Sequence, residues 1–173
     1  MPEKLYHFSE DPTIARFQPR HAPGQEARPT YVWAIDAEHA PLFWFPRDCP
    51  RITFWADEET TEGDQERFLS QGTSRRIHAI ESAWLGRMRS CGLYAYHFDA
   101  APFERYPEAG GYHVAQTEVV PLGCEPVGDL LERHTKADIE LRVTPSLWPL
   151  QRAVVASSLQ FSICRMRNAQ PPS

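Results

Sequence analysis

A chain of 173 residues and 19.8 kDa is long enough to bury a core without the help of disulfides or a metal. Hydrophobic residues make up 42% and charged residues 24% of it, a composition that excludes intrinsic disorder for most of the chain. The 18 basic and 23 acidic side chains give a net charge of −5, so we expect no bulk binding of nucleic acid.

Neither a membrane span nor a signal peptide is predicted. No apolar run approaches the roughly 20 residues of a membrane-spanning helix, and residues 1–10 lack the basic and apolar regions of a signal peptide. The four cysteines form no C-x-x-C pair, so we expect neither a disulfide nor a metal site. These features predict a cytoplasmic protein that does not bind membranes.

The pattern of short segments predicts an α+β fold. Aromatic, β-branched or alternating segments predict strands at 4–8, 31–35, 52–56, 76–81, 93–98, 139–143 and 159–166, and one or two strands within 112–120. Capping residues or early prolines predict short helices at 12–17, 37–45, 83–89, 127–134 and 147–156, and the acidic stretch 57–66 is a solvated segment or the edge of a helix. Helices this short do not suit a doubly wound parallel sheet, so we expect a largely antiparallel sheet, continuous or split.

No linker or internal repeat interrupts the chain, and 16 prolines indicate short elements joined by ordered loops. We therefore predict a single domain over 1–173, with a frayed tail over 168–173.

The segment Tyr6-His7-Phe8-Ser9 places an imidazole within an aromatic strand and a hydroxyl two residues further on. Because side chains alternate along a strand, His7 and Ser9 point to the same face. They can bind a polar ligand, in which case we expect both to line the largest pocket. Alternatively, His7 is a core histidine that hydrogen-bonds to a backbone carbonyl.

Two further groups of residues have both a structural and a functional interpretation. Arg47, Asp48 and Arg51 stand in a proline-stiffened loop, where an Arg–Asp pair can lock the loop or an arginine can bind phosphate. Gln116 and Glu118 share a face if 112–120 is a strand, and that face is either a site or a solvated surface. The five tryptophans favour packing over a base-stacking platform.

Three stretches resemble the skeleton of the ADP-ribosyltransferase-like fold. They are the Tyr-His-Phe-Ser strand at 6–9, the strand and acidic-capped helix at 31–40, and Gln-x-Glu at 116–118. The whole chain also resembles a bacterial domain family without an assigned activity, through LYHFSEDP, VWAIDAEH, FPRDCPR, WPLQRAVV and FSICRMRNA.

The transferase resemblance implies a split antiparallel sheet that holds NAD. His7 and Ser9 are then expected at the ribose and the nicotinamide amide, and Arg47 or Arg51 at the phosphates. Trp33, or Tyr31 before it, takes the place of the stacking tyrosine that the His-Tyr-Glu subclass carries.

In that hypothesis Glu118, with Gln116 beside it, steadies the oxocarbenium-like state or takes a proton from the acceptor.

Two hypotheses from different classes follow. In the first, the chain is an ADP-ribosyltransferase-like enzyme, or a related enzyme that processes NAD or another nucleotide. In the second, it is a non-catalytic α+β module that binds a small ligand or a protein partner through an aromatic pocket. The first requires His7, Glu118 and an arginine to converge on one cleft.

Overall fold

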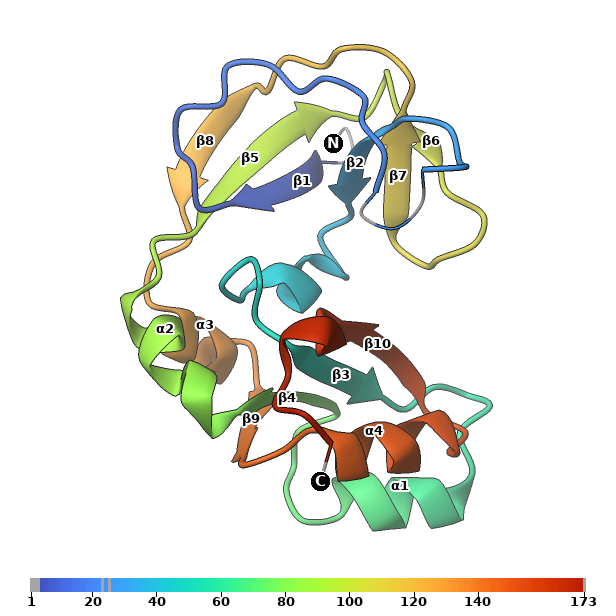
Figure 1. The fold of residues 1–173 in the computed structure, drawn as a ribbon. Helices are drawn as coiled ribbons and strands as arrows, with labels where there is room; N and C mark the ends of the chain where they lie inside the picture. The colour runs from blue at the N-terminus through green and yellow to red at the C-terminus, as the bar shows by residue number, and fades with distance from the viewer. Residues whose placement is uncertain (1–3, 23, 25, 173) are drawn as a thin grey trace. The chain divides into compact units, whose positions relative to one another are not determined.

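The computed structural model describes residues 4–22, 24 and 26–172 (Figure 1). The chain groups into two compact units, each made of two separate segments. Unit 1 comprises residues 1–44 and 92–128, and unit 2 comprises residues 45–91 and 129–173. Each unit has its own sheet and is described by itself.

Unit 1 contains a six-stranded antiparallel sheet with the strand order β6-β7-β2-β1-β5-β8 (Figure 1). The strands are β1 (Lys4–Ser9), β2 (Val32–Ile35), β5 (Tyr94–Asp99), β6 (Glu104–Arg105), β7 (Tyr112–Ala115) and β8 (Gly123–Pro126). A short 3₁₀ helix, η1 (Ala40–Phe43), follows β2. Strand β1 lies inside the sheet and pairs with β5 along its whole length, from Lys4 opposite Asp99 to Ser9 opposite Tyr94.

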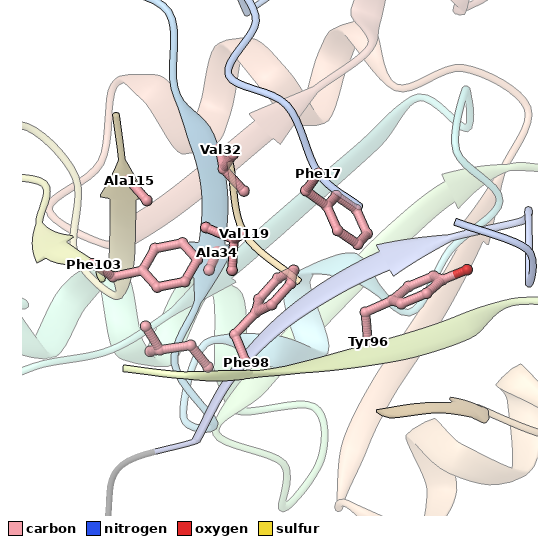
Figure 2. Packing of buried hydrophobic residues seen from close by; sticks show 9 residues of the cluster. Phe17, Val32, Ala34, Tyr96, Phe98, Phe103, Ala115 and Val119 are labelled. Atoms are coloured by element: carbon pink, nitrogen blue, oxygen red, sulfur yellow. The ribbon is translucent and has the colours of Figure 1, made fainter. Parts of the chain in front are cut away.

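The core of unit 1 lies on one face of this sheet (Figure 2). Leu5 from β1 and its partner Phe98 from β5 are almost fully buried there. Phe17 covers them, with its ring 5.0 Å from that of Phe98 and 5.1 Å from that of Tyr96. An isolated β-bridge between Phe17 and Val119 holds this cover in place. Edge-to-face contacts of this kind add to the stabilisation from apolar burial, which is roughly 1.5–3 kcal/mol for each large side chain.

Unit 2 contains a four-stranded sheet with the order β10-β3-β4-β9, in which only the β4–β9 pair of the described strands is parallel. The strands are β3 (Arg51–Trp55), β4 (Arg76–Glu81), β9 (Ile139–Thr144) and β10 (Gln160–Cys164). The helices are α1 (Glu62–Leu69), η2 (Ser82–Trp84), α2 (Leu85–Ser90), α3 (Leu130–Lys136), α4 (Trp148–Val155) and η3 (Met166–Asn168).

Helices α1 and α4 lie side by side in Figure 1 and supply Phe68 and Val154 to a core with Ile52, Phe54 and Ile77 of the sheet.

The predicted α+β class with a largely antiparallel arrangement is confirmed. Several predicted elements differ from those observed. The segment 12–17 forms a turn and a bridge in place of a helix, and the helix predicted at 37–45 is reduced to η1. The acidic segment 57–66 leads into α1, whose N-terminus is capped by the Thr61 hydroxyl. Strand β7 ends at Ala115, short of the end predicted for it at residue 120. No described helix is long and apolar enough to cross a membrane. All four cysteines are free.

The segment after η3 is fastened to unit 2 up to Gln170. Trp148 Nε1 donates to the Gln170 carbonyl at 2.6 Å, and the Gln170 amide donates to the buried carboxylate of Glu81 at 2.9 Å. Asn168 Nδ2 donates to the Asp48 carbonyl at 2.7 Å. The fraying predicted from Asn168 is therefore not observed up to Gln170, and Ser173 lies outside the described residues.

A pair of histidines is fully enclosed in unit 2. His78 of β4 is 0% exposed and His134 of α3 is 1% exposed, with His78 Nδ1 lying 2.9 Å from His134 Nε2. His134 Nδ1 lies 2.7 Å from the Leu130 carbonyl, which can only accept, so this nitrogen carries the proton of a neutral ring. His134 Nε2 then accepts from His78 Nδ1. This arrangement requires His134 to be neutral, and full burial favours the neutral form of His78 as well.

Burial lowers the pKa of His78 well below its ordinary value, and the positive charges of Arg76 and Arg51 act in the same direction. Burial also lowers the pKa of His134. The unfolded chain, with histidine pKa values near 6.5, therefore takes up protons that the folded chain does not.

We predict that the free energy of unfolding falls as the pH decreases below about 6.5, by up to about 1.4 kcal/mol per pH unit for each of the two histidines. Urea denaturation followed by circular dichroism between pH 5 and 7.5 measures it. A double variant, His78→Leu with His134→Leu, should flatten the slope, whereas His21→Gln, at an exposed histidine, should retain it. A slope that the double substitution leaves unchanged would contradict this assignment.

Candidate functional site

The candidate site is a hollow of about 300 Å³ on unit 1, which we call the hairpin hollow. It lies beside the β6–β7 hairpin, and the segment around Arg28 forms its other side. Its lining residues are Arg28, Pro29, Tyr31, Glu104, Arg105, Tyr106, Pro107, Glu108, Val114 and Gln116. This volume is at the lower end of the range for small-molecule sites, so it suits a ligand about the size of one ring system.

Aromatic rings form the apolar part of the hairpin hollow. The Tyr31 and Tyr106 rings line it, with their centroids 6.3 Å apart. Trp33 contacts both, at 5.7 Å from Tyr31 and 4.9 Å from Tyr106. The buried Trp33 Nε1 has no hydrogen-bond partner within the described part of the chain. Three rings in mutual edge-to-face contact make a stiff apolar wall against which a planar group can stack.

Positively charged, negatively charged and neutral polar side chains complete the lining. Arg28 Nη1 donates to the Tyr106 hydroxyl at 2.6 Å and to Glu108 Oε2 at 2.5 Å, which ties the two sides of the hollow together. The hydrogen bond from Arg28 lowers the pKa of Glu108. Arg105 and Glu104 add one charge of each sign, and Gln116 adds an amide that both donates and accepts. The lining therefore favours a polar ligand without a large net charge.

Backbone hydrogen bonds and a glycine hold the turn of the β6–β7 hairpin in place. The Tyr106 amide donates to the Tyr112 carbonyl at 2.8 Å, and the Asp36 amide donates to the Gly111 carbonyl at 2.9 Å. Gly111 has a φ of +79°, and a side chain there would collide with the His39 ring, so only glycine fits. His39 is itself held by Asp36, whose carboxylate lies 2.8 Å from His39 Nδ1.

His7 and Ser9 share a face of β1, as predicted, and it is the face that carries the core. His7 pairs with Tyr96 and Ser9 with Tyr94, and the His7 ring contacts Phe17 at 4.9 Å. His7 Nδ1 lies 2.9 Å from the Trp33 carbonyl, and the Ser9 hydroxyl accepts from the Asp11 amide at 3.1 Å. Neither residue lines the hairpin hollow.

Gln116 and Glu118 are separated by the end of strand β7. The chain bends at 116–117, so the shared strand face expected for them does not form. Gln116 lines the hairpin hollow, next to Val114. Glu118 instead accepts hydrogen bonds from Arg16 and Gln18, and it does not line the hollow.

Arg47 and Arg51 belong to unit 2, whereas the other predicted site residues belong to unit 1. Arg51 is only 5% exposed; its Nη1 donates to the Cys49 carbonyl at 3.2 Å and its guanidinium lies 5.1 Å from the centre of the Phe45 ring. Burial raises the pKa of Cys49 to about 12, so this thiol is protonated at neutral pH.

Within the described ranges no group of three His, Cys, Asp or Glu side chains could hold a metal ion.

Arg28, Tyr106 and Glu108 line the hairpin hollow but were not predicted from the sequence. These residues come from segments that are far apart in the chain, and no local pattern marks them as neighbours. Three residues considered from the sequence do belong to this part of unit 1: Gln116 and Tyr31 line the hairpin hollow, and Trp33 contacts Tyr31.

The chain is an α+β protein with two antiparallel-rich sheets. The profile of a family of unknown function, DUF6886, matches residues 6–169, and the chain belongs to this family. No curated protein and no solved structure matches the chain. The resemblance to a domain family without an assigned activity is thereby confirmed, while the resemblance to ADP-ribosyltransferases stays a prediction.

We predict that Arg28→Gln raises the pKa of Glu108 towards its ordinary value, because the substitution removes the cation that stabilises the carboxylate. Carbon-detected NMR titration of the glutamate carboxyl groups measures this pKa. Arg16→Gln, which removes the partner of Glu118, is the matched control and should leave the Glu108 titration unchanged. An unchanged Glu108 pKa in Arg28→Gln would show that the tie across the hollow does not form in solution.

Proposed function

We propose that this chain is a binding module that holds a small, planar, polar ligand in the hairpin hollow. The observation that carries the proposal is that Tyr31 and Tyr106 line the same hollow as the Gln116 amide. Stacking on an aromatic ring contributes roughly 1–3 kcal/mol for a nucleobase, and an amide can pair with the polar edge of such a ring. A nucleobase or a nicotinamide ring therefore matches the lining in size, shape and polarity.

The balance of charges supports a ring and its sugar as the bound portion. Arg28 and Arg105 are matched by Glu104 and Glu108, so a phosphate placed in the hollow would meet two carboxylates. NAD, nicotinamide and adenosine monophosphate are accordingly the first ligands to test, since they share planar rings and differ in charge.

We expect isothermal titration calorimetry to detect binding of at least one of these ligands in the micromolar to millimolar range. Tyr106→Leu should weaken it by about tenfold or more through the loss of stacking, and Gln116→Ala by about fivefold through the loss of a hydrogen bond. Tyr94→Leu, on the core face of β5, and Gln160→Ala in unit 2 make the same chemical changes outside the hollow and should leave affinity nearly unchanged.

Absence of binding by all three ligands, or parent-like affinity in Tyr106→Leu, would refute the proposal. The melting temperature of each variant shows whether it is folded.

The transferase hypothesis makes a further demand on Glu118. If NAD is turned over, a carboxylate near the ribose acts mainly in the transition state. Glu118→Gln should then lower nicotinamide release by on the order of 10²-fold while leaving NAD affinity nearly intact. Arg16→Gln removes the ion pair but keeps the carboxylate, and should retain activity. Equal losses in both variants would assign Glu118 a structural role.

A further inference from the structure

We propose that Arg165 and Arg167, together with Arg47, form an anion site on unit 2 that binds the phosphate groups of a small phosphorylated molecule. We call these three residues the arginine cluster. The site is independent of the hairpin hollow, because all of its residues lie in the other unit.

The strand register of unit 2 brings the parts of the arginine cluster together. Strand β10 runs antiparallel to β3, with Cys164 opposite Arg51. The residue after β10 is therefore beside the loop that leads into β3. Arg165 Nε donates to the Arg47 carbonyl at 3.2 Å, and Asn168 Nδ2 donates to the next carbonyl along the loop, that of Asp48, at 2.7 Å. Two segments more than a hundred residues apart in the sequence are thus joined by direct hydrogen bonds.

The backbone at Arg165 adopts a conformation that an arginine rarely takes. Its φ of 58° and ψ of 25° lie in the left-handed region, where a side chain with a Cβ costs roughly 1 kcal/mol. Asp138 is the other described residue besides glycine with a positive φ. Strained backbone that the surrounding structure maintains is concentrated at functional sites. The left-handed conformation at Arg165 turns the chain from β10 into η3, so that Asn168 reaches the 47–48 loop.

Positive charge is concentrated at this place in a chain that is acidic overall. Partial burial lowers the pKa of Arg165, and the positive charges of Arg167, Arg51 and Arg47 lower it further, while Asp48 opposes them. Arg165 and Arg167 form no ion pair with a carboxylate in the described part of the molecule. A bound anion would relieve the mutual repulsion of these guanidinium groups.

Arg51, predicted from the sequence to bind phosphate, has a different part in this arrangement. Its guanidinium is enclosed against Phe45 and donates a hydrogen bond to the Cys49 carbonyl. Arg51 therefore adds positive charge to the electrostatic field of the arginine cluster without contacting the ligand. Arg167 is exposed and Arg165 is half-buried, so these two can touch a ligand. Guanidinium groups pair with phosphate oxygens through two parallel hydrogen bonds, which makes phosphate the anion that suits them best.

Inorganic pyrophosphate is the probe for this site, measured by calorimetry at low ionic strength. We expect the parent protein to bind pyrophosphate more tightly than phosphate, because it has more charge and more acceptor oxygens. Arg165→Gln and Arg167→Gln should each weaken binding by about tenfold to 100-fold, the effect of one charge-assisted hydrogen bond. Arg165→Lys keeps the charge and the backbone strain but loses the planar group, and should fall between the parent and Arg165→Gln.

Arg152→Gln is the matched control, an exposed arginine on α4 of the same unit, and should change affinity by less than about twofold. Tyr106→Leu should also bind pyrophosphate like the parent, which separates this proposal from that for the hairpin hollow. Absence of binding at about 10 mM pyrophosphate, or parent-like affinity in both glutamine variants, would overturn the anion site. Binding of a random oligonucleotide without any binding of pyrophosphate would overturn it as well, in favour of a nucleic-acid surface.

Discussion

The alternation of side chains along β1 decides which face of unit 1 carries the core around Phe17 and which carries the hairpin hollow. Leu5, His7 and Ser9 point to the face covered by Phe17, and Tyr6 points to the other, opposite Ile35 of β2. The register continues outward from Ile35 to Tyr112 and from Trp33 to Val114, so the hairpin hollow is built on the face opposite the one that Phe17 covers. A slip of one residue would exchange the two faces entirely.

Unit 2 uses buried polar groups to position segments that are distant in sequence. The Glu81 carboxylate, 0% exposed, accepts from the Leu147 amide at the start of α4 and from the Gln170 amide near the end of the chain. The His78–His134 pair joins β4 to α3 in the same way. Apolar contacts tolerate small displacements, whereas each of these hydrogen bonds requires a particular partner at a particular place. Arg165 and Arg167 of the arginine cluster lie in this C-terminal segment, so their positions depend on the hydrogen bond between Gln170 and Glu81.

The regular elements were predictable where the local pattern was strong. The strand Arg76–Glu81 alternates along its length and is found with the predicted bounds. Strands β6 and β8 were missed because they are short and exposed, and β8 contains both glycine and proline. The tail was expected to fray because nothing local indicates that Glu81 is buried, and glutamates are seldom buried. The hairpin hollow depends on strand pairing between distant segments, which a single sequence does not encode in any one motif.

The path of the chain between β4 and β9 also has a consequence for biosynthesis. These parallel neighbours in unit 2 are separated in sequence by residues 92–128, which belong to unit 1. Every strand of unit 1 has therefore been made by the time residue 128 is added, whereas β3 and β4 still lack their outer partners, β9 and β10. Since chains fold from the N-terminus as they emerge from the ribosome, unit 1 can complete its sheet while the apolar faces of β3 and β4 are still exposed to solvent. During that interval the nascent chain contains all strands of unit 1, whereas β3 and β4 are unpaired on their outer sides. A chaperone that binds exposed apolar segments would act on β3 and β4 at this stage.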